Sequence, residues 1–314
     1  MNWLYDGTEA KLWLDSYVQR SLQEDVTENV RFLNQVDIEE CSVAEYGEPP
    51  CMRLVKNING ITEEVTVRVP GILCSKTLPP VHALRSTKAE HVRYLRQFVR
   101  LTALGSESFN LYEGVFASIQ DAFAAAPAVT EVEPFDFGVY EGYYGVDLHA
   151  RYLTERRFVP SQRHIPFTAD VDPNSVLEEA RGGKFIRVED NVVQYSRKVE
   201  EGDGTTHYEP CLPEDFREGD IVETTGTFVA FPTGRGGEYK MVFCLRSLTM
   251  LTSMFREKSR ISKAVVPVKD PREGRKRKRA KPPTAQSLKR SFIKYGRRND
   301  SSGGNREDST AMME

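Results

Sequence analysis

The fold predicted for this chain rests on two long runs, residues 221–231 (IVETTGTFVAF) and residues 239–251 (YKMVFCLRSLTML). Both runs are rich in the β-branched and aromatic residues that favour strands, and residues 232–237 between them have the composition of a loop. Gly226, inside the first run, predicts a bulge or a sharp bend. Long strands that bend must coil, so we expect a curved antiparallel sheet or an OB-like β-barrel.

Two further strand pairs are predicted upstream of these runs. Residues 184–188 and 192–199 flank a short polar loop at 189–191 and indicate a hairpin. Residues 52–57 and 61–69 flank the pair Asn59-Gly60, whose members both accept a positive φ and therefore indicate a tight hairpin turn.

Three helices are predicted in the first half of the chain. One follows Thr8, and another covers residues 106–126. The third begins at a capping box, Thr87 to Glu90, and continues to residue 103. On this third helix Arg93, Arg96 and Arg100 form a basic stripe, which is typical both of a DNA-contacting helix and of an ordinary amphipathic surface helix.

Together these elements predict an α+β protein in three parts. Residues 1–134 form a mixed region of helices and a hairpin, residues 135–255 form the β-rich, OB-like domain, and residues 256–314 form a disordered basic tail. Charge supports this division. Residues 1–255 contain 25 Lys+Arg against 39 Asp+Glu, whereas residues 256–298 contain 17 Lys+Arg against 3 Asp+Glu. Long-range attraction to nucleic acid must therefore come from the tail or from a local basic patch.

Residues 184–251 carry a resemblance to a known family. The segments FREGDIVE (216–223) and KMVFCLRSL (240–248) match the patterns F-x-x-G-D-I-V-E and K-M-x-x-x-L-R-S-L. In these patterns the chain resembles a family of uncharacterised fungal proteins. The resemblance covers about a fifth of the chain and implies an architecture without implying an activity.

If the curved sheet binds nucleic acid, its aromatic residues would stack on bases and its basic residues would contact phosphates. The alternative for each residue is a place in the core or an ordinary solvated position. The candidate residues are Arg187, Tyr195, Arg197, Lys198, Arg235, Tyr239, Lys240 and Arg246.

The strongest short motif is the cationic run at residues 275–281, RKRKRAK. Such a run in a disordered tail fits the acidic grooves of nuclear import receptors, and the competing interpretation is a tail that binds RNA non-specifically. The predicted targeting residues are Arg275, Lys276, Arg277, Lys278, Arg279 and Lys281.

Sequence motifs for catalysis are lacking. No G-x-S-x-G, H-E-x-x-H or G-x-G-x-x-G occurs, and the five cysteines are widely spaced without a C-x-x-C. We therefore expect unpaired thiols in a reducing compartment, and no cofactor. Asp147, His149 and His164 define the alternative, a metal-dependent enzyme using two histidines and a carboxylate. The order Asp-x-His is the reverse of the usual one for such sites.

The sequence thus predicts a nuclear, non-enzymatic binding protein. Its expected partners are a nuclear import receptor and either DNA, RNA or a chromatin-associated protein. The first residues, MNWLYD, lack the basic and apolar regions of a signal peptide, and no apolar run approaches the length of a membrane span, so no membrane association is expected.

Overall fold

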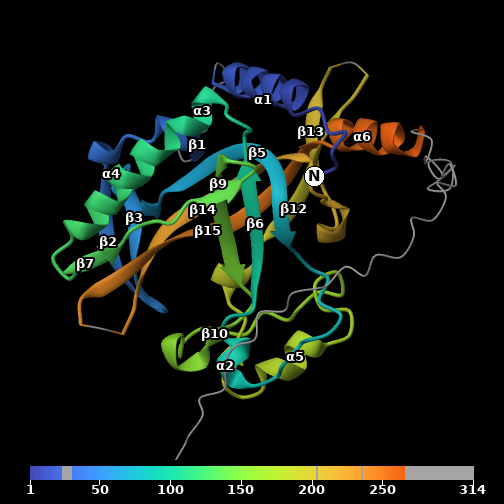
Figure 1. The fold of residues 1–314 in the computed structure, drawn as a ribbon. Helices are drawn as coiled ribbons and strands as arrows, with labels where there is room; N and C mark the ends of the chain where they lie inside the picture. The colour runs from blue at the N-terminus through green and yellow to red at the C-terminus, as the bar shows by residue number, and fades with distance from the viewer. Residues whose placement is uncertain (23–29, 203, 235, 266–314) are drawn as a thin grey trace, which may run out of the picture. The chain divides into compact units, whose positions relative to one another are not determined.

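The computed structural model describes residues 1–22, 30–202, 204–234 and 236–265. Met1–Val266 form one compact unit, shown in Figure 1. The helices are α1 (Gly7–Ser21), α2 (Ala89–Val92), α3 (Glu107–Asn110), α4 (Tyr112–Ala124), α5 (Val176–Arg181) and α6 (Met254–Val265). The strands are β1 (Val30–Phe32), β2 (Cys41–Gly47), β3 (Pro50–Ile58), β4 (Ile61–Glu64), β5 (Thr66–Thr77), β6 (Arg96–Thr102), β7 (Glu131–Glu133), β8 (Gly138–Tyr140), β9 (Tyr143–Arg151), β10 (Thr154–Glu155), β11 (Phe185–Ile186), β12 (Gln194–Glu200), β13 (Thr206–Pro210), β14 (Ile221–Pro232) and β15 (Glu238–Thr252).

Five of these strands close into a barrel. β5 pairs with β6, β6 with β9 and β9 with β15, and β15 then pairs with β14, which returns to β5. Only β9 and β15 are parallel neighbours; the other pairs are antiparallel. Numbered along the chain, the ring runs 1-2-3-5-4, which is the Greek-key connectivity of an OB barrel. The predicted α+β class and OB-like barrel are confirmed.

The barrel draws strands from both sides of the boundary predicted at residues 134/135. β5 and β6 precede that boundary, whereas β9, β14 and β15 follow it. The change to glycine- and tyrosine-rich sequence after residue 135 marks the entry into β8 and β9. The predicted boundary therefore runs through the barrel.

Gly226 marks an irregularity of the long strand pair, as the sequence predicted. The pairing of β14 with β15 shifts register between Thr225 and Gly226. A Cβ at residue 226 would lie 2.6 Å from the ring of Phe243 and 2.9 Å from the carbonyl oxygen of Cys244. Only glycine lets the two strands approach this closely while they bend.

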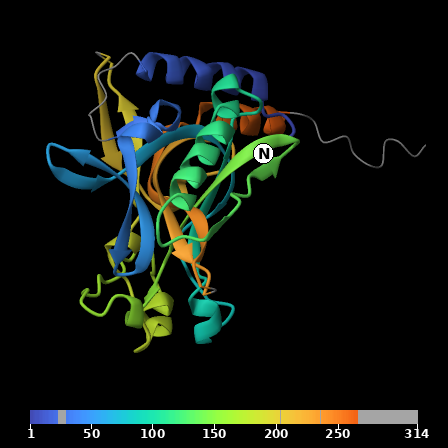
Figure 2. The same cartoon turned by 90° about the vertical axis from the view of Figure 1, so that its left-hand side faces the viewer.

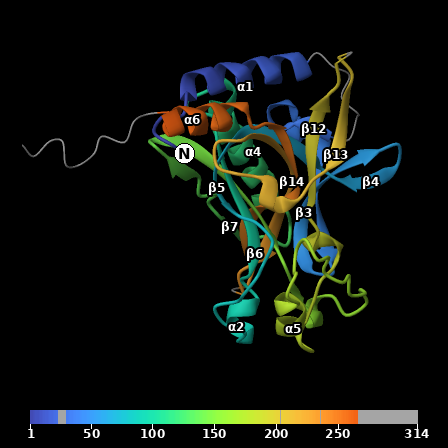
Figure 3. The same cartoon turned by 90° about the vertical axis from the view of Figure 1, so that its right-hand side faces the viewer.

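The barrel core is aromatic at the level of α4. Phe228 and Phe243 stack with ring centroids 4.4 Å apart, and Phe116 of α4 meets both rings edge-on. All three side chains are fully buried. Figures 2 and 3 show α1 and α6 at one end of the barrel and α2 and α5 at the other.

The helix predicted over residues 87–103 is wrong beyond its first turn. α2 ends at Val92, and residues 96–102 form strand β6 between β5 and β9. Val99 and Leu101 point into the barrel while Phe98 and Arg100 point out, which is the alternation of a strand. Hydrogen bonding to β5 and β9 on its two edges stabilises the strand more than the capping box stabilises a helix. Arg93, Arg96 and Arg100 therefore do not form a basic stripe on a helix.

Of the other local predictions, several are confirmed and one is wrong. The helix predicted after Thr8 is confirmed as α1, although it begins at Gly7 with Asp6 as its N-cap. The single helix predicted over 106–126 is divided into α3 and α4, and Asn59 and Gly60 adopt the predicted positive φ angles of 54° and 85°. The hairpin predicted over 184–199 is wrong. β11 pairs with β10, whereas β12 pairs with β13 and β15, because the loop at 189–191 forms a 3₁₀ turn, η4 (Glu189–Asn191).

The predicted tail begins too early. Residues 254–265 form α6, whose Phe255 is buried against the core. Arg256 forms an ion pair with the buried Asp220 at 2.7 Å, and Lys258 contacts Glu9 of α1 at 2.9 Å. The acidic body thus holds the first basic residues of the predicted tail. Residues 266–314 lie outside the described residues.

Candidate functional site

A cleft of about 520 Å³ lies on the outer surface of the barrel where β9, β14 and β15 meet. The turn between β2 and β3 forms one wall, and the segment that follows β9 forms another. The loops between β5 and β6 and between β14 and β15 also line the cleft, through residues such as Tyr94 and Thr233. The cleft therefore combines a barrel face with the two loops that surround it.

Strand alternation places the polar floor of the cleft. On β9, Val146, Leu148 and Ala150 are buried, so His149 and Arg151 project outward into the cleft. Antiparallel pairing sets Arg96 of β6 opposite Arg151 and Phe98 opposite His149. Residues opposite each other lie on the same face of a sheet, so Arg96 extends this surface at its margin.

The lining of the cleft is basic although the body is acidic. Arginine contributes far more charge to it than the carboxylates of Glu155 and Asp190. The lining arginines are Arg53, Arg93, Arg151, Arg157 and Arg246. Because residues 1–255 carry 39 acidic against 25 basic residues, this gathering of arginines is a local reversal of charge. A cleft with this lining favours anionic ligands.

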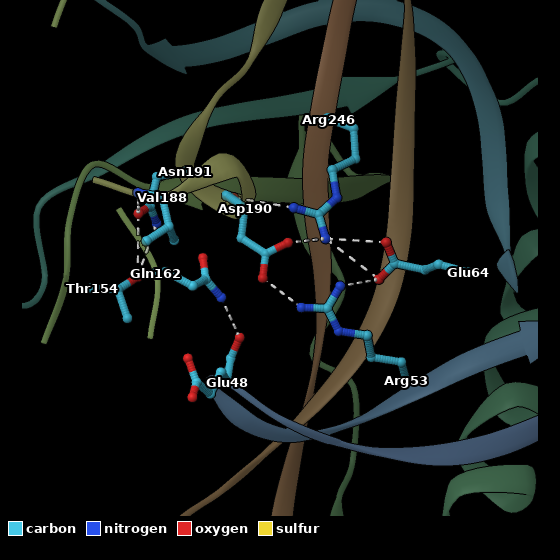
Figure 4. A network of polar contacts seen from close by, with 9 residues as sticks. All are labelled: Glu48, Arg53, Glu64, Thr154, Gln162, Val188, Asp190, Asn191 and Arg246. Carbon is cyan, nitrogen blue, oxygen red and sulfur yellow. Dashed lines mark hydrogen bonds and ion pairs between the residues drawn. The ribbon is translucent and has the colours of Figure 1, made fainter. Parts of the chain in front are cut away.

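Two of the lining arginines form a compact network with two carboxylates, shown in Figure 4. Arg53 contacts Glu64 at 3.1 Å and also pairs with Asp190. Arg246 contacts Asp190 at 3.1 Å and Glu64 at 3.3 Å. This network joins β3, β4, β15 and η4, and it neutralises both arginines.

Glu155 is the shared carboxylate partner of two others. It lies 3.2 Å from Arg93 and 2.8 Å from Arg157. Arg157 stays 67% exposed and lies over the ring of Phe158, with 4.5 Å between the guanidinium carbon and the ring centroid. These side chains form the wall contributed by the segment after β9.

Arg151 and Arg96 differ from the four paired arginines. Within the described part of the chain neither forms an ion pair with a carboxylate, and both are exposed. The guanidinium of Arg151 lies over the ring of Phe231, 5.4 Å from its centroid. Burial, reinforced by the positive charges of Arg96, Arg151 and Lys240, lowers the pKa of His149 to about 4, so the imidazole is neutral at pH 7.

Aromatic side chains complete the lining. Tyr94 is 68% exposed and Phe158 is 38% exposed, so both rings are accessible from the cleft. Phe231 lies at the end of β14, beside Arg151. Exposed rings next to guanidinium groups offer flat surfaces on which planar ligand groups can stack.

Uncharged hydrogen bonds join the wall after β9 to η4 and to the β2–β3 turn. The Thr154 hydroxyl exchanges hydrogen bonds with the Asn191 side chain, whose Oδ1 also accepts from the backbone N–H of Val188 at 2.9 Å. Gln162 donates to the carbonyl of Glu48 at 2.7 Å, which connects this wall to the β2–β3 turn (Figure 4). These bonds fix the separation of the two walls.

The residues predicted from the sequence to bind nucleic acid do not share one surface. Of those that the structure describes, only Arg246 lines the cleft. Arg187 is buried with its guanidinium against the Phe167 ring and the carbonyl of Pro166, and Tyr195 is half-buried and donates to Gln97. The other members lie on β12 and β15 or outside the described residues. Arg197 pairs with Asp215, Lys198 with Glu200 and Lys240 with Glu133, Tyr239 is half-buried on β15, and Arg235 lies outside the described residues.

The targeting residues Arg275, Lys276, Arg277, Lys278, Arg279 and Lys281 also lie outside the described residues. The five cysteines are free, as expected. None of the described helices has the length and apolar character needed to span a bilayer.

The residues of the alternative enzyme site do not converge. Asp147 forms a bidentate ion pair with Arg100 at 2.6 and 2.7 Å. His164 contacts Glu178 at 3.0 Å through Nε2 and accepts from the backbone N–H of Arg187 through Nδ1. Among the residues that the structure describes, no three His, Cys, Asp or Glu side chains are placed to hold a metal ion.

Sequence reasoning missed most of the cleft. The sequence placed Arg96 in a helical basic stripe. It gave no functional prediction for Arg53, Arg151, Tyr94 or Phe158. The alternation in residues 96–102, RQFVRLT, was the available signal that Arg96 and Phe98 share an outward strand face. The cleft itself brings together segments far apart in the sequence, and no local pattern reports that.

Comparisons with known proteins add little. No family model matches the chain, and no curated protein matches it either. Among solved structures the chain has similarity to gp2.5, a single-stranded DNA-binding protein encoded by bacteriophage T7. The sequences are 10% identical, the match covers 59% of this chain and 85% of that one, and the TM-score is 0.26. At this level of similarity the function of gp2.5 does not carry over to this chain.

Proposed function

We propose that this protein binds single-stranded nucleic acid in the arginine-lined cleft. The observation that carries the proposal is the local reversal of charge, in which exposed aromatic rings lie beside arginines on an otherwise acidic body. Binding of this type combines basic side chains that follow the phosphates with rings on which bases stack. In OB barrels the face of the second and third strands and the loops 1–2 and 4–5 bind oligonucleotides. The cleft borders the equivalent face of β6 and β9, and both equivalent loops line it.

The dimensions of the cleft favour a single strand over a duplex. A volume of about 520 Å³ is typical of sites that enclose a small ligand, or a few nucleotides of a strand. The rings of Tyr94 and Phe158 can stack only on bases that are not already stacked within a helix. A duplex would present its phosphates to the rim and leave these rings without a partner.

The test is fluorescence anisotropy with labelled oligo-dT and oligo-U, titrated with the full chain at several salt concentrations between 50 and 200 mM. We expect saturable binding whose affinity falls as salt rises, because each phosphate contact releases about 0.7 counterion on a single strand. A second chain with the six basic residues at 275–281 changed to glutamine separates the tail from the cleft. If the glutamine variant lost all binding to the oligonucleotides, a role for the cleft would be contradicted. The same conclusion would follow if the full chain bound proteins and neither oligonucleotide.

For the cationic run we propose recognition by a nuclear import receptor, and hence a nuclear location. Compact clusters of lysine and arginine fit acidic receptor grooves, and five of the targeting residues are consecutive, Arg275 to Arg279. Changing the last four of these, Lys276 to Arg279, to alanine in a fluorescent fusion is expected to abolish nuclear accumulation in imaged cells. A matched fusion with Lys289, Arg290 and Lys294 changed instead should accumulate normally. Unchanged accumulation of the first fusion would refute the proposal.

A further inference from the structure

The six arginines of the cleft and its margin fall into two electrostatic classes. Arg53, Arg93, Arg157 and Arg246 each contact a carboxylate at 3.3 Å or less. Arg96 and Arg151 lie directly opposite each other on β6 and β9, and within the described residues neither has a carboxylate partner. Like charges directly opposite on one sheet face destabilise the pair, so the free protein holds an unrelieved repulsion here.

A phosphate group is the ligand that would relieve this repulsion. We propose that Arg96 and Arg151 are the phosphate anchor of the cleft, and that His149, two residues before Arg151 on β9, gains a proton when the phosphate binds. This inference rests on the proposed function and specifies which side chains perform it. Guanidinium groups bind phosphate through two parallel hydrogen bonds, and the ring of Phe231 already orients Arg151.

The surroundings of His149 make it a sensor of this phosphate. It faces Phe98 on β6 and Cys244 on β15, neither of which is charged at pH 7. The charged groups around it are predominantly cationic, and the nearest carboxylates already have partners. The charged groups on the barrel strands are Arg96, the Arg100–Asp147 pair of β6 and β9, Arg151, Lys240 and Arg246. Those from the cleft walls are Arg53, Asp190 and Glu155. A bound phosphate would reverse the local field and favour the imidazolium.

By reciprocity, a ligand that raises the pKa of His149 must bind more tightly as the pH falls. The pKa of the free protein is about 4. A return to the ordinary value of about 6.5 on binding predicts affinity for oligo-dT about 20-fold higher at pH 5 than at pH 7. Thymine has no group that titrates in this interval, so the change reports on the protein.

The decisive comparison uses three single variants of the full chain, R96Q, R151Q and R197Q. We expect R96Q and R151Q each to weaken oligo-dT binding about tenfold and to lower the salt slope by about 0.7. R197Q is the matched control, because it removes the same charge from an exposed arginine that lies outside the cleft and pairs with Asp215, and it should change affinity less than about twofold. Thermal unfolding of each variant confirms that it is folded.

The variant H149Q supplies a second readout, because its affinity for oligo-dT should lose most of the increase between pH 7 and pH 5. NMR titration of His149 with inorganic pyrophosphate as the probe should show its pKa rising. If the chain binds no oligonucleotide, the proposed function fails. If it binds but R197Q weakens binding as much as R96Q and R151Q, or if the pH dependence survives in H149Q, the proposed function stands and the anchor is wrong.

Discussion

Replacing Asp190 with alanine is expected to strengthen binding of single-stranded nucleic acid and, at the same time, to destabilise the protein by about 2–3 kcal/mol. Asp190 is one of the two carboxylates that neutralise Arg53 and Arg246. Without it, Glu64 is left to compensate two cations whose side chains are only 11% and 19% exposed. Breaking a fully buried ion pair costs about 3–5 kcal/mol, and the partial exposure of this network lowers the expected loss.

The gain in affinity follows from the same loss of a carboxylate. Arg53 and Arg246 already line the cleft, so releasing them adds positive charge where the phosphates would bind. The salt slope for oligo-dT should rise by about 0.7 for each additional phosphate contact. Urea unfolding gives the stability, and anisotropy at several salt concentrations gives the slope.

Glu189 provides the matched control. It precedes Asp190 in the same 3₁₀ turn and is exposed, so Glu189→Ala changes the net charge equally without touching Arg53 or Arg246. We expect its stability to change by less than about 0.5 kcal/mol and its salt slope to stay the same. If both variants strengthened binding equally, net charge would be the cause and the arginine network would have no special part.

The sequence predicted the barrel because its signal is local. The long runs at 221–231 and 239–251, the bend at Gly226 and the Asn59-Gly60 turn each reflect residues close together in the chain. The strand β6 was missed because its local signal conflicts with its environment. A capping box at Thr87 favours a helix, while pairing with β5 and β9 stabilises a strand.

The cleft could not be predicted for a different reason. Whether an arginine attracts a ligand depends on whether a carboxylate neutralises it, and those carboxylates are distant in sequence. Arg246 is separated from Glu64 by 182 residues, and Arg53 from Asp190 by 137. Counting charges assigned Arg256 to the basic tail, although Arg256 pairs with Asp220 in the folded unit.

The largest loss of stability is expected on replacing Glu223 with alanine, about 3–5 kcal/mol. Glu223 of β14 is 8% exposed and accepts two hydrogen bonds from Arg68 of β5, both at 2.9 Å. It also accepts from the hydroxyl of Tyr17 at 3.0 Å, and this bond ties α1 to the barrel. Alanine would leave the guanidinium of Arg68, 19% exposed, without its carboxylate. Urea unfolding measures the loss, and Glu131→Ala, at an exposed position on β7, is the control with an expected change below about 0.5 kcal/mol.

A second replacement separates charge from packing. If the cost of Glu223→Ala comes from an uncompensated cation, then Glu223→Leu combined with Arg68→Met should recover most of the lost stability, because well-packed apolar residues often replace a buried ion pair without cost. Arg68→Met alone should be nearly as damaging as Glu223→Ala, since it leaves the carboxylate buried with only the Tyr17 hydroxyl as its partner. The double variant could instead lose as much stability as the two single replacements added together. The two side chains would then act through packing and not through coupled charges, because independent effects add whereas the effects of coupled charges do not.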